Sequence, residues 1–500
     1  MAAVLNADER RYLTWVSQAV RTNPFTESRV ELDARIAGEY GPDRSFRDTD
    51  GAVRDRAIGK VSAWIENLDR RNRADINAYT GQDRELVQTA FLFDIFHRFI
   101  PEFDGLISDQ MAAGDRSLPV KFAGRVLELL LKRGFPRSDA MRYFELCFQL
   151  RRAFFFIQKN LVGRSPCMQK LRASLWNNVF THQIDWYDRY LWNRMEDFST
   201  LILGSTGAGK GTAAMAIGRS GYIPFDSHKG CFAESFMHSF TALNLSQFSP
   251  TLIESELFGH KKGAFTGAVE AYQGIFSRCS AYGAIFLDEI GEVGQNVQIK
   301  LLQVLQERTY TPVGSHQSNR FSGRVIAATN RPLAQMREAG TLRDDFYYRL
   351  CSDVITLPSL AQRIVEDPME LDDLVAHTMT RILGGANAEL ADRIAVEIRR
   401  QPGTDYAWPG NVRELEQCVR RILLNRSYTP EPLVRDLDPA KQLAREMAAG
   451  RLDAQSLLTG YCAMLYKRLG TYEAVARVTS LDRRTVKKYV LEGSAVFPSP

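Results

Sequence analysis

The residues best suited to chemistry in this sequence form a glycine loop that follows the apolar run 201–203. Gly204, Gly209 and Lys210 meet the spacing GxxxxGK. A triphosphate needs several inward-pointing backbone N–H groups, a helix N-terminus and a cation, and only glycine lets the chain wrap so closely. For a lone loop, an ordinary glycine turn between a strand and a helix is the alternative. The spacing predicts a phosphate-binding P-loop made of Gly204, Gly207, Ala208, Gly209, Lys210, Gly211 and Thr212.

The residue after the P-loop lysine departs from the usual pattern. A Ser or Thr hydroxyl normally stands there as a ligand for Mg²⁺. This sequence has Gly211 at that position, and Thr212 follows one residue later. Thr212 is therefore the candidate hydroxyl ligand, and the departure weakens the metal assignment but not the phosphate assignment.

A second apolar run, 284–287, ends in the acidic pair Asp288 and Glu289. Ligands of open α/β sheets bind at the carboxyl ends of the strands, so a buried strand here would deliver both acids to the phosphates. Asp288 would hold a hydrated Mg²⁺, and Glu289 would polarise the attacking water. Alone, such a pair is also typical of the first turn of a helix. Together with the P-loop it predicts a nucleotide triphosphatase site.

Between these two halves lies an unusual hexapeptide, 263–268, preceded by basic residues. An aromatic residue among glycines and small residues forms a poor helix or strand, which predicts a mobile loop that presents Phe265. The alternative is a tight turn with Phe265 in the core. The residues of this loop are Gly263, Ala264, Phe265, Thr266, Gly267 and Ala268.

The hexapeptide matches letter for letter the GAFTGA signature of bacterial enhancer-binding proteins, the activators of sigma-54 RNA polymerase. The sequence from about residue 160 to 426 resembles the AAA+ ATPase domain of that family. By this resemblance, the GAFTGA loop contacts sigma-54. Val162 and Gly163 would line the adenine pocket, and Arg413, in the motif 408–416, would reach the phosphates of ATP as the second sensor.

The resemblance also implies further catalytic residues. Asn244 would hydrogen-bond the catalytic Glu289 and couple nucleotide state to the GAFTGA loop, and Asn330 would orient the lytic water. Arg343 and Arg349 would reach the γ-phosphate bound by the neighbouring subunit. Without the resemblance, Asn244 would be a polar turn residue, and Arg343 and Arg349 would be two solvated arginines.

The end of the chain, 466–490, has the apolar spacing of a helix-turn-helix and resembles the Fis-type domain that ends this family. We expect Ala474, Val475, Val478, Leu481 and Val486 to pack its two helices together. A basic second helix suits phosphates and base edges in a major groove, although such a helix is often only a solvated face. The predicted DNA-binding residues are Arg483, Arg484, Thr485, Lys487 and Lys488.

The sequence thus predicts three folds. Residues 1–158 form an α-helical domain, whose position in the family implies a regulatory role. Residues 159–357 form the α/β AAA+ nucleotide-binding subdomain, and 358–426 its helical lid. A linker at 427–454 leads to a small all-α helix-turn-helix domain at 455–500. A Trp- and Tyr-rich segment, 176–192, is either an insertion or a docking surface for the N-terminal domain.

Length and composition indicate the number of domains, the partners and the compartment to expect. A chain of 500 residues is too long for a single hydrophobic core, and the net charge of +5 permits a local basic surface but does not by itself indicate nucleic-acid binding. Seven scattered cysteines suit a reducing cytosol. No apolar run approaches the roughly 18 residues that a membrane span requires, so we expect a cytoplasmic protein without a membrane partner.

The resemblance implies an ATP-hydrolysing transcriptional activator that uses Mg²⁺, assembles with itself into a hexameric or heptameric ring and binds enhancer DNA. The ring would push Phe265 and Thr266 against sigma-54 to open promoter DNA. One alternative is a DNA-binding regulator that uses ATP only as a ligand or assembly signal. Another is a nucleotide kinase, because the P-loop also resembles that of adenylate kinase. The acidic pair, the second sensor and the basic end of the chain argue against the kinase.

Overall fold

The computed structural model describes residues 3–39, 51–403, 406–430, 443–444, 447, 450 and 452–496. The chain forms two compact units, Met1–Tyr428 and Thr429–Pro500.

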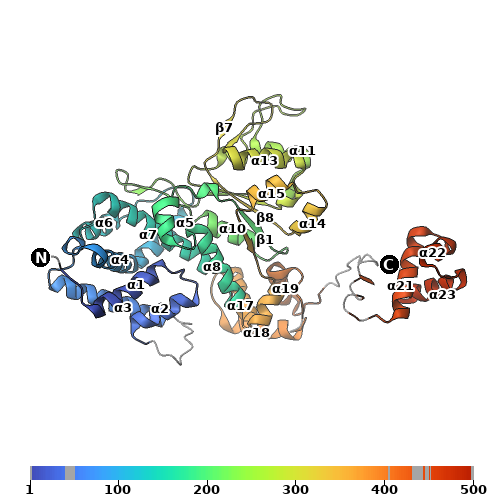
Figure 1. Ribbon diagram of the computed structural model, residues 1–500, viewed down its shortest axis with the longest axis horizontal. Coiled ribbons are helices and arrows are strands. Elements are labelled where there is room, and N and C mark those ends of the chain that lie inside the picture. The colour runs from blue at the N-terminus through green and yellow to red at the C-terminus, as the bar shows by residue number, and fades with distance from the viewer. Residues whose placement is uncertain are drawn as a thin grey trace. The chain divides into compact units, whose positions relative to one another are not determined.

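A five-stranded parallel sheet lies at the centre of the first unit, with the strand order β4-β5-β8-β1-β9 (Figure 1). Its middle strands are buried on both faces, as in α/β proteins whose sheets are covered by helices on either side. The predicted α/β AAA+ fold is confirmed. The strands are β1 (Thr200–Leu203), β4 (Phe240–Asn244), β5 (Ala284–Asp288), β8 (Arg324–Thr329) and β9 (Asp353–Thr356).

Alternate strand residues divide between two hydrophobic cores. Ile202 and Phe286 belong to one core, whereas their neighbours Leu201 and Leu287 belong to the other. The first face packs against α10 (Lys210–Gly218). The second packs against helices on the GAFTGA side, namely α11 (Pro250–Phe258), α12 (Ile275–Arg278), α13 (Gln295–Glu307), α14 (Leu333–Glu338) and α15 (Asp344–Leu350).

Short elements complete this subdomain and connect its strands. Two antiparallel pairs join β2 (Phe225–Asp226) to β3 (Cys231–Phe232) and β6 (Thr309–Tyr310) to β7 (Asn319–Arg320). Single turns lie at α9 (Ile184–Trp186), η2 (Tyr187–Leu191), η3 (Met195–Asp197), η4 (Leu245–Gln247) and η5 (Ile290–Glu292).

Four helices after the sheet form the lid around a core of their own that includes Leu371, Ile394 and Leu415. They are α16 (Leu360–Glu366), α17 (Glu370–Leu383), α18 (Ala388–Arg400) and α19 (Asn411–Asn425).

The described N-terminal region is helical, as predicted. Its first helix begins with a capping box in which Asn6 and Glu9 exchange side-chain to backbone hydrogen bonds. The elements are α1 (Ala7–Arg21), α2 (Glu27–Ala37), α3 (Ala52–Arg70), η1 (Ile76–Ala78), α4 (Gly81–Arg98), α5 (Ile100–Ala113), α6 (Ala123–Lys132), α7 (Arg137–Asn160) and α8 (Pro166–Phe180).

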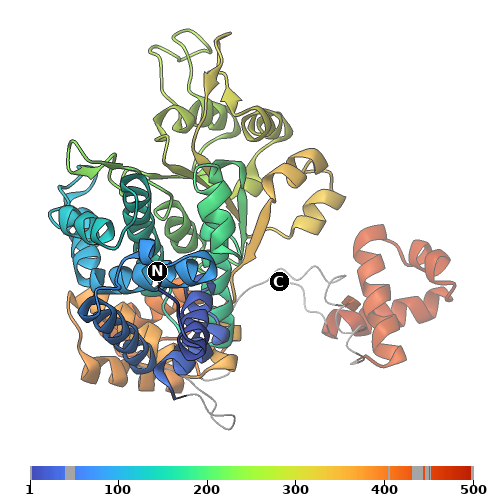
Figure 2. The ribbon, with the colours of Figure 1, turned by 60° about the vertical axis from the view of Figure 1, so that its left-hand side comes forward.

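The N-terminal helices share one continuous hydrophobic core with the α10 face of the sheet. Figures 1 and 2 show α7 beside α8 and α10 in both views. Phe148 of α7 stacks on Phe232 of β3 with ring centroids 4.3 Å apart, and Phe144 contacts the same ring at 5.8 Å. The helices therefore pack directly on the ATPase subdomain; the domain boundary at residue 158 remains a prediction.

One face of α7 also binds the segment that follows α10. The Glu145 carboxylate accepts from the Phe225 N–H at 2.8 Å and from the Tyr222 hydroxyl, while Gln149 Nε2 donates to the Ser220 carbonyl at 2.9 Å. Arg152 donates to the Gly221 carbonyl, and burial lowers its pKa to about 9. Spacings of three and four residues place all three side chains on one side of the helix. We call Glu145, Gln149 and Arg152 the α7 clasp.

The Trp- and Tyr-rich segment lies against the N-terminal helices. The Trp176 ring meets Phe25 edge-on at 6.0 Å, and the buried Tyr187 hydroxyl donates to Gln149 Oε1 at 2.9 Å. Of the two interpretations left open by the sequence, these contacts favour the docking surface.

The second unit contains α21 (Ala454–Leu469), α22 (Tyr472–Thr479) and α23 (Arg483–Val496). Val475 and Val486 are fully buried between the helices, as predicted. The expectation for Val478 is wrong, because its side chain is 54% exposed. Ser480 takes the left-handed conformation (φ 57°) between α22 and α23, at the position where a glycine is common.

The shared core leads to a prediction for Phe232→Ala. Removing a buried aromatic ring should cost about 3–5 kcal/mol. We expect a lower Tm, with faster hydrogen exchange in both α7 and α10, because Phe232 contacts the N-terminal helices and belongs to the core that α10 shares. Phe198→Ala, at a side chain that is 39% exposed, is the control. An unchanged Tm, with faster exchange confined to β2 and β3, would contradict a shared core.

Candidate nucleotide site and GAFTGA loop

The P-loop connects β1 to the N-terminus of α10, so its backbone N–H groups lie at the positive end of the helix dipole. Lys210 is the first residue of α10 and is buried. Its ammonium group donates to the Gly204 carbonyl at 3.0 Å, across the loop. The predicted P-loop residues therefore form one loop closed by the Lys210 cation, which we call the phosphate cradle.

Asp288 and Glu289 lie next to this cradle at the end of β5. Glu289 Oε1 is 3.7 Å from Lys210 Nζ. Glu289 has a left-handed backbone (φ 56°), a conformation that costs a non-glycine residue energy and clusters at functional sites. The turn directs the two neighbouring carboxylates differently: Asp288 Oδ1 accepts from the Glu289 N–H at 3.0 Å, while Glu289 reaches toward the lysine.

Asn330, the residue expected to orient the lytic water as the first sensor, contacts Glu289. Its backbone N–H donates to Glu289 Oε2 at 3.3 Å. Its side-chain amide donates to the Thr206 hydroxyl at 3.0 Å. Asn330 thus touches both the P-loop and the acidic pair.

The Asn244 side chain makes a different contact from the one implied by the resemblance. Asn244 is in register with Asp288 on the neighbouring strand. Its Oδ1 accepts from Ser246 N at 3.0 Å and from Ser246 Oγ at 2.7 Å, so it caps η4. Among the described residues, no hydrogen bond joins the Asn244 side chain to Glu289, and the predicted switch contact stays a prediction.

The lid touches the P-loop through the N-terminus of α19. The Val412 N–H donates to the Gly207 carbonyl at 3.2 Å. A Cβ on Gly207 would lie 2.2 Å from the Gly410 carbonyl oxygen and 3.0 Å from Arg413 Cβ, so this approach requires glycine. Arg413, the predicted second sensor, therefore begins beside the phosphate cradle.

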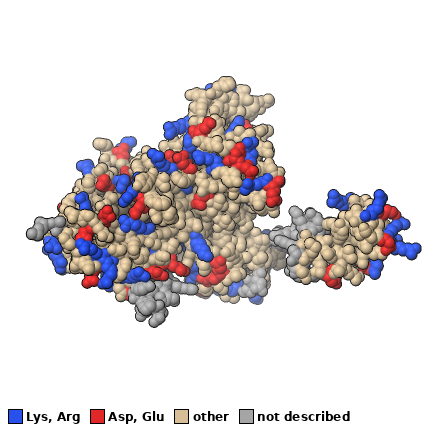
Figure 3. Space-filling model, viewed as in Figure 1, with Lys and Arg blue, Asp and Glu red and all other residues tan. Residues whose placement is uncertain are grey.

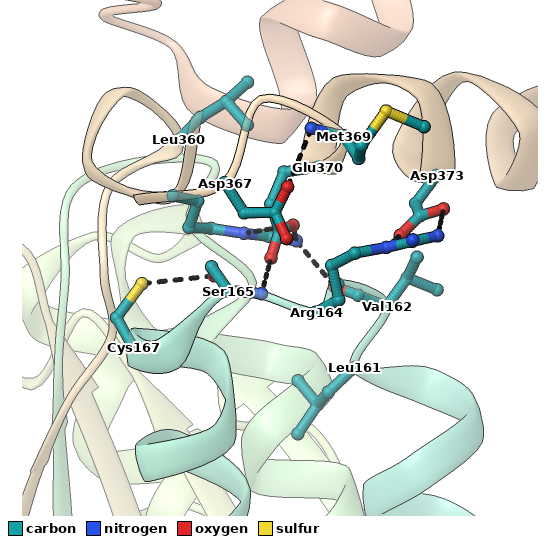
Figure 4. A network of polar contacts seen from close by, with 12 residues as sticks. Leu161, Val162, Arg164, Ser165, Cys167, Leu360, Asp367, Met369, Glu370 and Asp373 are labelled. Carbon is teal, nitrogen blue, oxygen red and sulfur yellow. Dashed lines mark hydrogen bonds and ion pairs between the residues drawn. The ribbon is translucent and has the colours of Figure 1, made fainter. Parts of the chain in front are cut away.

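Val162 and Gly163 lie in a strap, 161–165, that the lid holds through a buried ion pair (Figure 4). Arg363 binds Glu370 at 2.7 Å, with side chains 5% and 0% exposed. Arg363 also donates to the Val162 carbonyl at 2.5 Å, and the Ser165 N–H donates to Glu370 at 2.7 Å. The ion pair therefore fastens the predicted adenine-pocket residues to the lid.

The strap is also bound by Arg172 of α8. This guanidinium donates to the carbonyls of Leu161 and Gly163, and burial lowers its pKa to about 10. A Cβ on Gly163 would lie 2.3 Å from a Glu370 oxygen, and its φ of 132° also favours glycine. Val162 packs against the lid core.

The GAFTGA loop is a tight turn in the segment between α11 and α12. The Gly263 N–H donates to the Ala268 carbonyl at 2.8 Å, and the Ala268 N–H donates to the Phe265 carbonyl at 3.0 Å. Phe265 is 38% exposed, and Thr266 is exposed. The alternative with Phe265 in the core is wrong, because its ring rests on the surface against His260, with centroids 4.9 Å apart.

His260 is a supporting residue that sequence reasoning did not single out. One ring nitrogen lies 2.6 Å from Ser255 Oγ and the other 3.0 Å from the Glu270 carbonyl oxygen. These bonds fix the ring on which Phe265 rests. The only signal for this role in the sequence is position: His260 stands five residues before Phe265, so its ring can support Phe265 in a tight loop.

Arg343 and Arg349, the arginines expected to reach the γ-phosphate of the neighbouring subunit, differ in their contacts. Arg343 pairs with Asp345 at 2.7 Å on the surface, with 37% of its side chain exposed. Arg349 donates to the Leu305 carbonyl near the C-terminal end of α13, at 2.9 and 2.7 Å. Arg343 is thus the more accessible cation, whereas Arg349 also satisfies a helix terminus.

The five predicted DNA-binding residues lie on the first turns of α23. Asp482 caps the helix, because its Oδ1 accepts from the N–H groups of Arg484 at 2.9 Å and Thr485 at 3.0 Å. Arg483 pairs with Glu473 at 2.6 Å, whereas Arg484 and Lys487 are exposed and form no ion pair with another described residue. Figure 3 shows Lys and Arg side chains gathered on part of this unit.

The donor set suits a metal that is carried mainly by phosphates. Among the residues the structure describes, no three His, Cys, Asp or Glu side chains form a metal-holding group. Mg²⁺ is commonly bound through one or two carboxylates together with phosphates, which fits Asp288 beside the P-loop.

Among the residues that the structure describes, no helix has the length and apolar character needed to span a membrane.

Comparison with known proteins places this site in a family context. The family described as the Sigma-54 interaction domain matches residues 186–356. The DNA-binding transcriptional regulator NtrC of Azospirillum brasilense is 37% identical over 269 residues, which cover 53% of this chain and 48% of that protein. The transcriptional regulatory protein ZraR of Salmonella typhimurium is 33% identical over 337 residues, 66% of this chain and 68% of that protein.

The chain thus spans about half the length of NtrC and about two thirds of ZraR. A crystal structure of NtrX from Brucella abortus aligns with 74% of this chain and 79% of that protein, at 22% identity and a TM-score of 0.39.

The strap leads to a prediction for Glu370→Ala. Removing the carboxylate leaves the Arg363 guanidinium buried without its partner, which should cost about 3–5 kcal/mol. Asp373→Ala is the control, because it breaks the neighbouring but exposed pair with Arg164, worth about 1 kcal/mol or less. Chemical denaturation should show a much larger loss for Glu370→Ala. Equal losses would mean that the buried pair does not hold the strap.

Proposed function

This chain belongs to the sigma-54-dependent enhancer-binding activators, and we propose that it hydrolyses ATP to remodel the sigma-54 RNA polymerase holoenzyme and drive open-complex formation. The observation that carries the proposal is the convergence of Lys210, Glu289 and Asn330 beside the P-loop, in the subdomain that also exposes Phe265. Family membership supports the target, and the geometry supports hydrolysis.

The phosphates of the nucleotide would be held by the P-loop N–H groups and Lys210. The strap residues Val162 and Gly163 would line the pocket of its adenine base. Mg²⁺, held by Asp288 and the Thr212 hydroxyl, would neutralise charge on the phosphates. Glu289 would accept a hydrogen bond from the attacking water and draw its proton, while Asn330 orients the same water. Lys210 holds the outer phosphates, and Arg413 approaches them from the lid.

A ring of this protein, hexameric or heptameric, would complete each site with a cation from the next subunit. Arg343 and Arg349 are the proposed donors, because a guanidinium binds a γ-phosphate with two parallel hydrogen bonds. Arg343 is already at the surface. Arg349 would first have to leave the Leu305 carbonyl.

The loop 263–268 would be the part that contacts sigma-54. An aromatic ring held on the surface costs an isolated protein solubility, so a partner must justify it. The helix α23 would read enhancer DNA with Arg483, Arg484, Thr485, Lys487 and Lys488. Arg484 and Lys487, which form no ion pair with another described residue, suit phosphates.

A second candidate is a DNA-binding regulator that uses ATP only as a ligand or assembly signal. Gly211, in place of the usual hydroxyl residue after Lys210, favours it. Glu289 argues against it, because a strained acidic residue aimed at a phosphate cradle serves hydrolysis better than binding.

The first test is Glu289→Gln. The amide keeps the shape but cannot take the water's proton, so ATP turnover should fall by about 100-fold or more while ATP affinity stays within a few-fold. Glu292→Gln is the matched control, since this nearby acid pairs with Arg331 on the surface. Steady-state turnover and equilibrium binding measure the two effects. Unchanged turnover in Glu289→Gln would favour the ligand-only regulator.

The second test is Thr266→Ala in the loop. Thr266 is exposed, and no hydrogen bond among the described residues joins its side chain to the P-loop, so ATP turnover should be retained. Capture of sigma-54 with a transition-state analogue of ATP, and open-complex formation at a sigma-54 promoter, should both be lost. Thr251→Ala, an exposed threonine on α11, is the control. Normal promoter opening by Thr266→Ala would refute the proposed contact.

A further inference from the structure

Thr206 occupies one of the variable positions of the P-loop, yet it joins two other parts of the site. Its hydroxyl accepts from Asn330 Nδ2 at 3.0 Å, and its carbonyl accepts from Asn411 Nδ2 at 3.0 Å. Asn330 lies at the end of the sheet and Asn411 at the start of the lid helix α19. Thr206 by itself therefore connects Asn330 to the lid.

Asn411 is held in place by every hydrogen-bonding group of its side chain. Oδ1 accepts from the Leu360 N–H at 2.8 Å, and Nδ2 donates to Ser205 Oγ at 2.8 Å as well as to Thr206. The residue is only 2% exposed and has a left-handed backbone (φ 53°). Such strain persists only where surrounding contacts over-determine the conformation.

These hydrogen bonds form one path to the Glu289 carboxylate, which crosses Thr206 and Asn330 through the covalent bonds of those residues. It runs from Leu360 of the lid through Asn411 and Thr206 to Asn330. The Asn330 N–H continues it to Glu289 Oε2 at 3.3 Å. Every link is a direct contact, so displacement of the lid helix moves the P-loop carbonyl, and with it the sensor amide.

We propose that Thr206 and Asn411 are positioning residues that couple closure of the lid to the alignment of Asn330 and Glu289 for hydrolysis. The inference rests on the proposed ATPase function and deepens it. Neither residue needs to touch the reacting atoms. Both act by fixing the side chain that does, which lowers the reorganisation required when the water attacks.

The test begins with Thr206→Val, which removes the hydroxyl and keeps the branched shape. The Thr206 side chain is exposed, so the fold should tolerate the change. One net hydrogen bond corresponds to about a fivefold to tenfold change in rate. We expect kcat to fall by about that factor with ATP affinity within twofold. Thr206→Ser, which retains the hydroxyl, should restore kcat.

A double-mutant cycle separates coupling from general damage. Thr206→Val should lower kcat little further in an Asn330→Ala background, because the hydroxyl then has no amide to hold. Asn411→Ala should lower kcat and speed hydrogen exchange at the Leu360 N–H. Its control is Asn72→Ala, because Asn72 has the same φ of 53° but follows α3 in the N-terminal region and not in the lid.

The outcomes distinguish the coupling from the ATPase proposal. If the unaltered protein hydrolyses ATP and Thr206→Val has normal kcat, or its effect adds fully to that of Asn330→Ala, the coupling is refuted and the ATPase stands. If the unaltered protein does not hydrolyse ATP, the proposed function fails. Hydrogen exchange then decides the coupling: faster exchange at the Asn330 N–H in Thr206→Val supports it, and unchanged exchange refutes it.

Discussion

The parallel pairing of β5, β8 and β1 is the constraint on which the rest of the site depends. In a parallel sheet, neighbouring strands end at the same edge, and here Leu203 is in register with Thr329 and Leu287 with Ala327. The residues that follow these strands therefore meet, which brings the P-loop, the acidic pair and Asn330 together without a dedicated scaffold. Substitutions that shifted one strand would separate all three groups at once.

The sequence predicted what local chemistry specifies. The GxxxxGK spacing, the acidic pair after an apolar run and the GAFTGA hexapeptide each lie within a short stretch, so residue type and spacing sufficed. Helical periodicity likewise predicted the N-terminal helices. The prediction that Val478 packs between the helices was wrong because α22 is a short helix with few core contacts, and periodicity alone does not say which residues such a helix buries.

The parts that the sequence did not predict depend on contacts between distant residues. Thr206 and Asn411 are 205 residues apart, and neither has a residue type that signals function. Phe148 and Phe232 stack across the boundary between predicted domains, where an aromatic-rich helix indicates a core but not its partner. Asn244 was assigned by position in a motif, and its contact with Ser246 is a local alternative that motif matching does not weigh.

The shared core also limits how the N-terminal helices can regulate the ATPase, if they carry the role that their position in the family implies. Separating them would expose several aromatic rings, among them Phe144, Phe148 and Phe232. Each buried phenylalanine contributes about 1.5–3 kcal/mol, so full separation would cost on the order of ten kcal/mol, comparable with the stability of a whole domain. A ligand shifts a conformational equilibrium only by its difference in affinity for the two states, typically about 1–3 kcal/mol, which is well below that cost. Rearrangement of the α7 clasp is a far smaller change, because Glu145, Gln149 and Arg152 contact the segment directly after α10, the helix that carries Lys210. Regulation by displacement of that segment, with the core left intact, is the energetically accessible route.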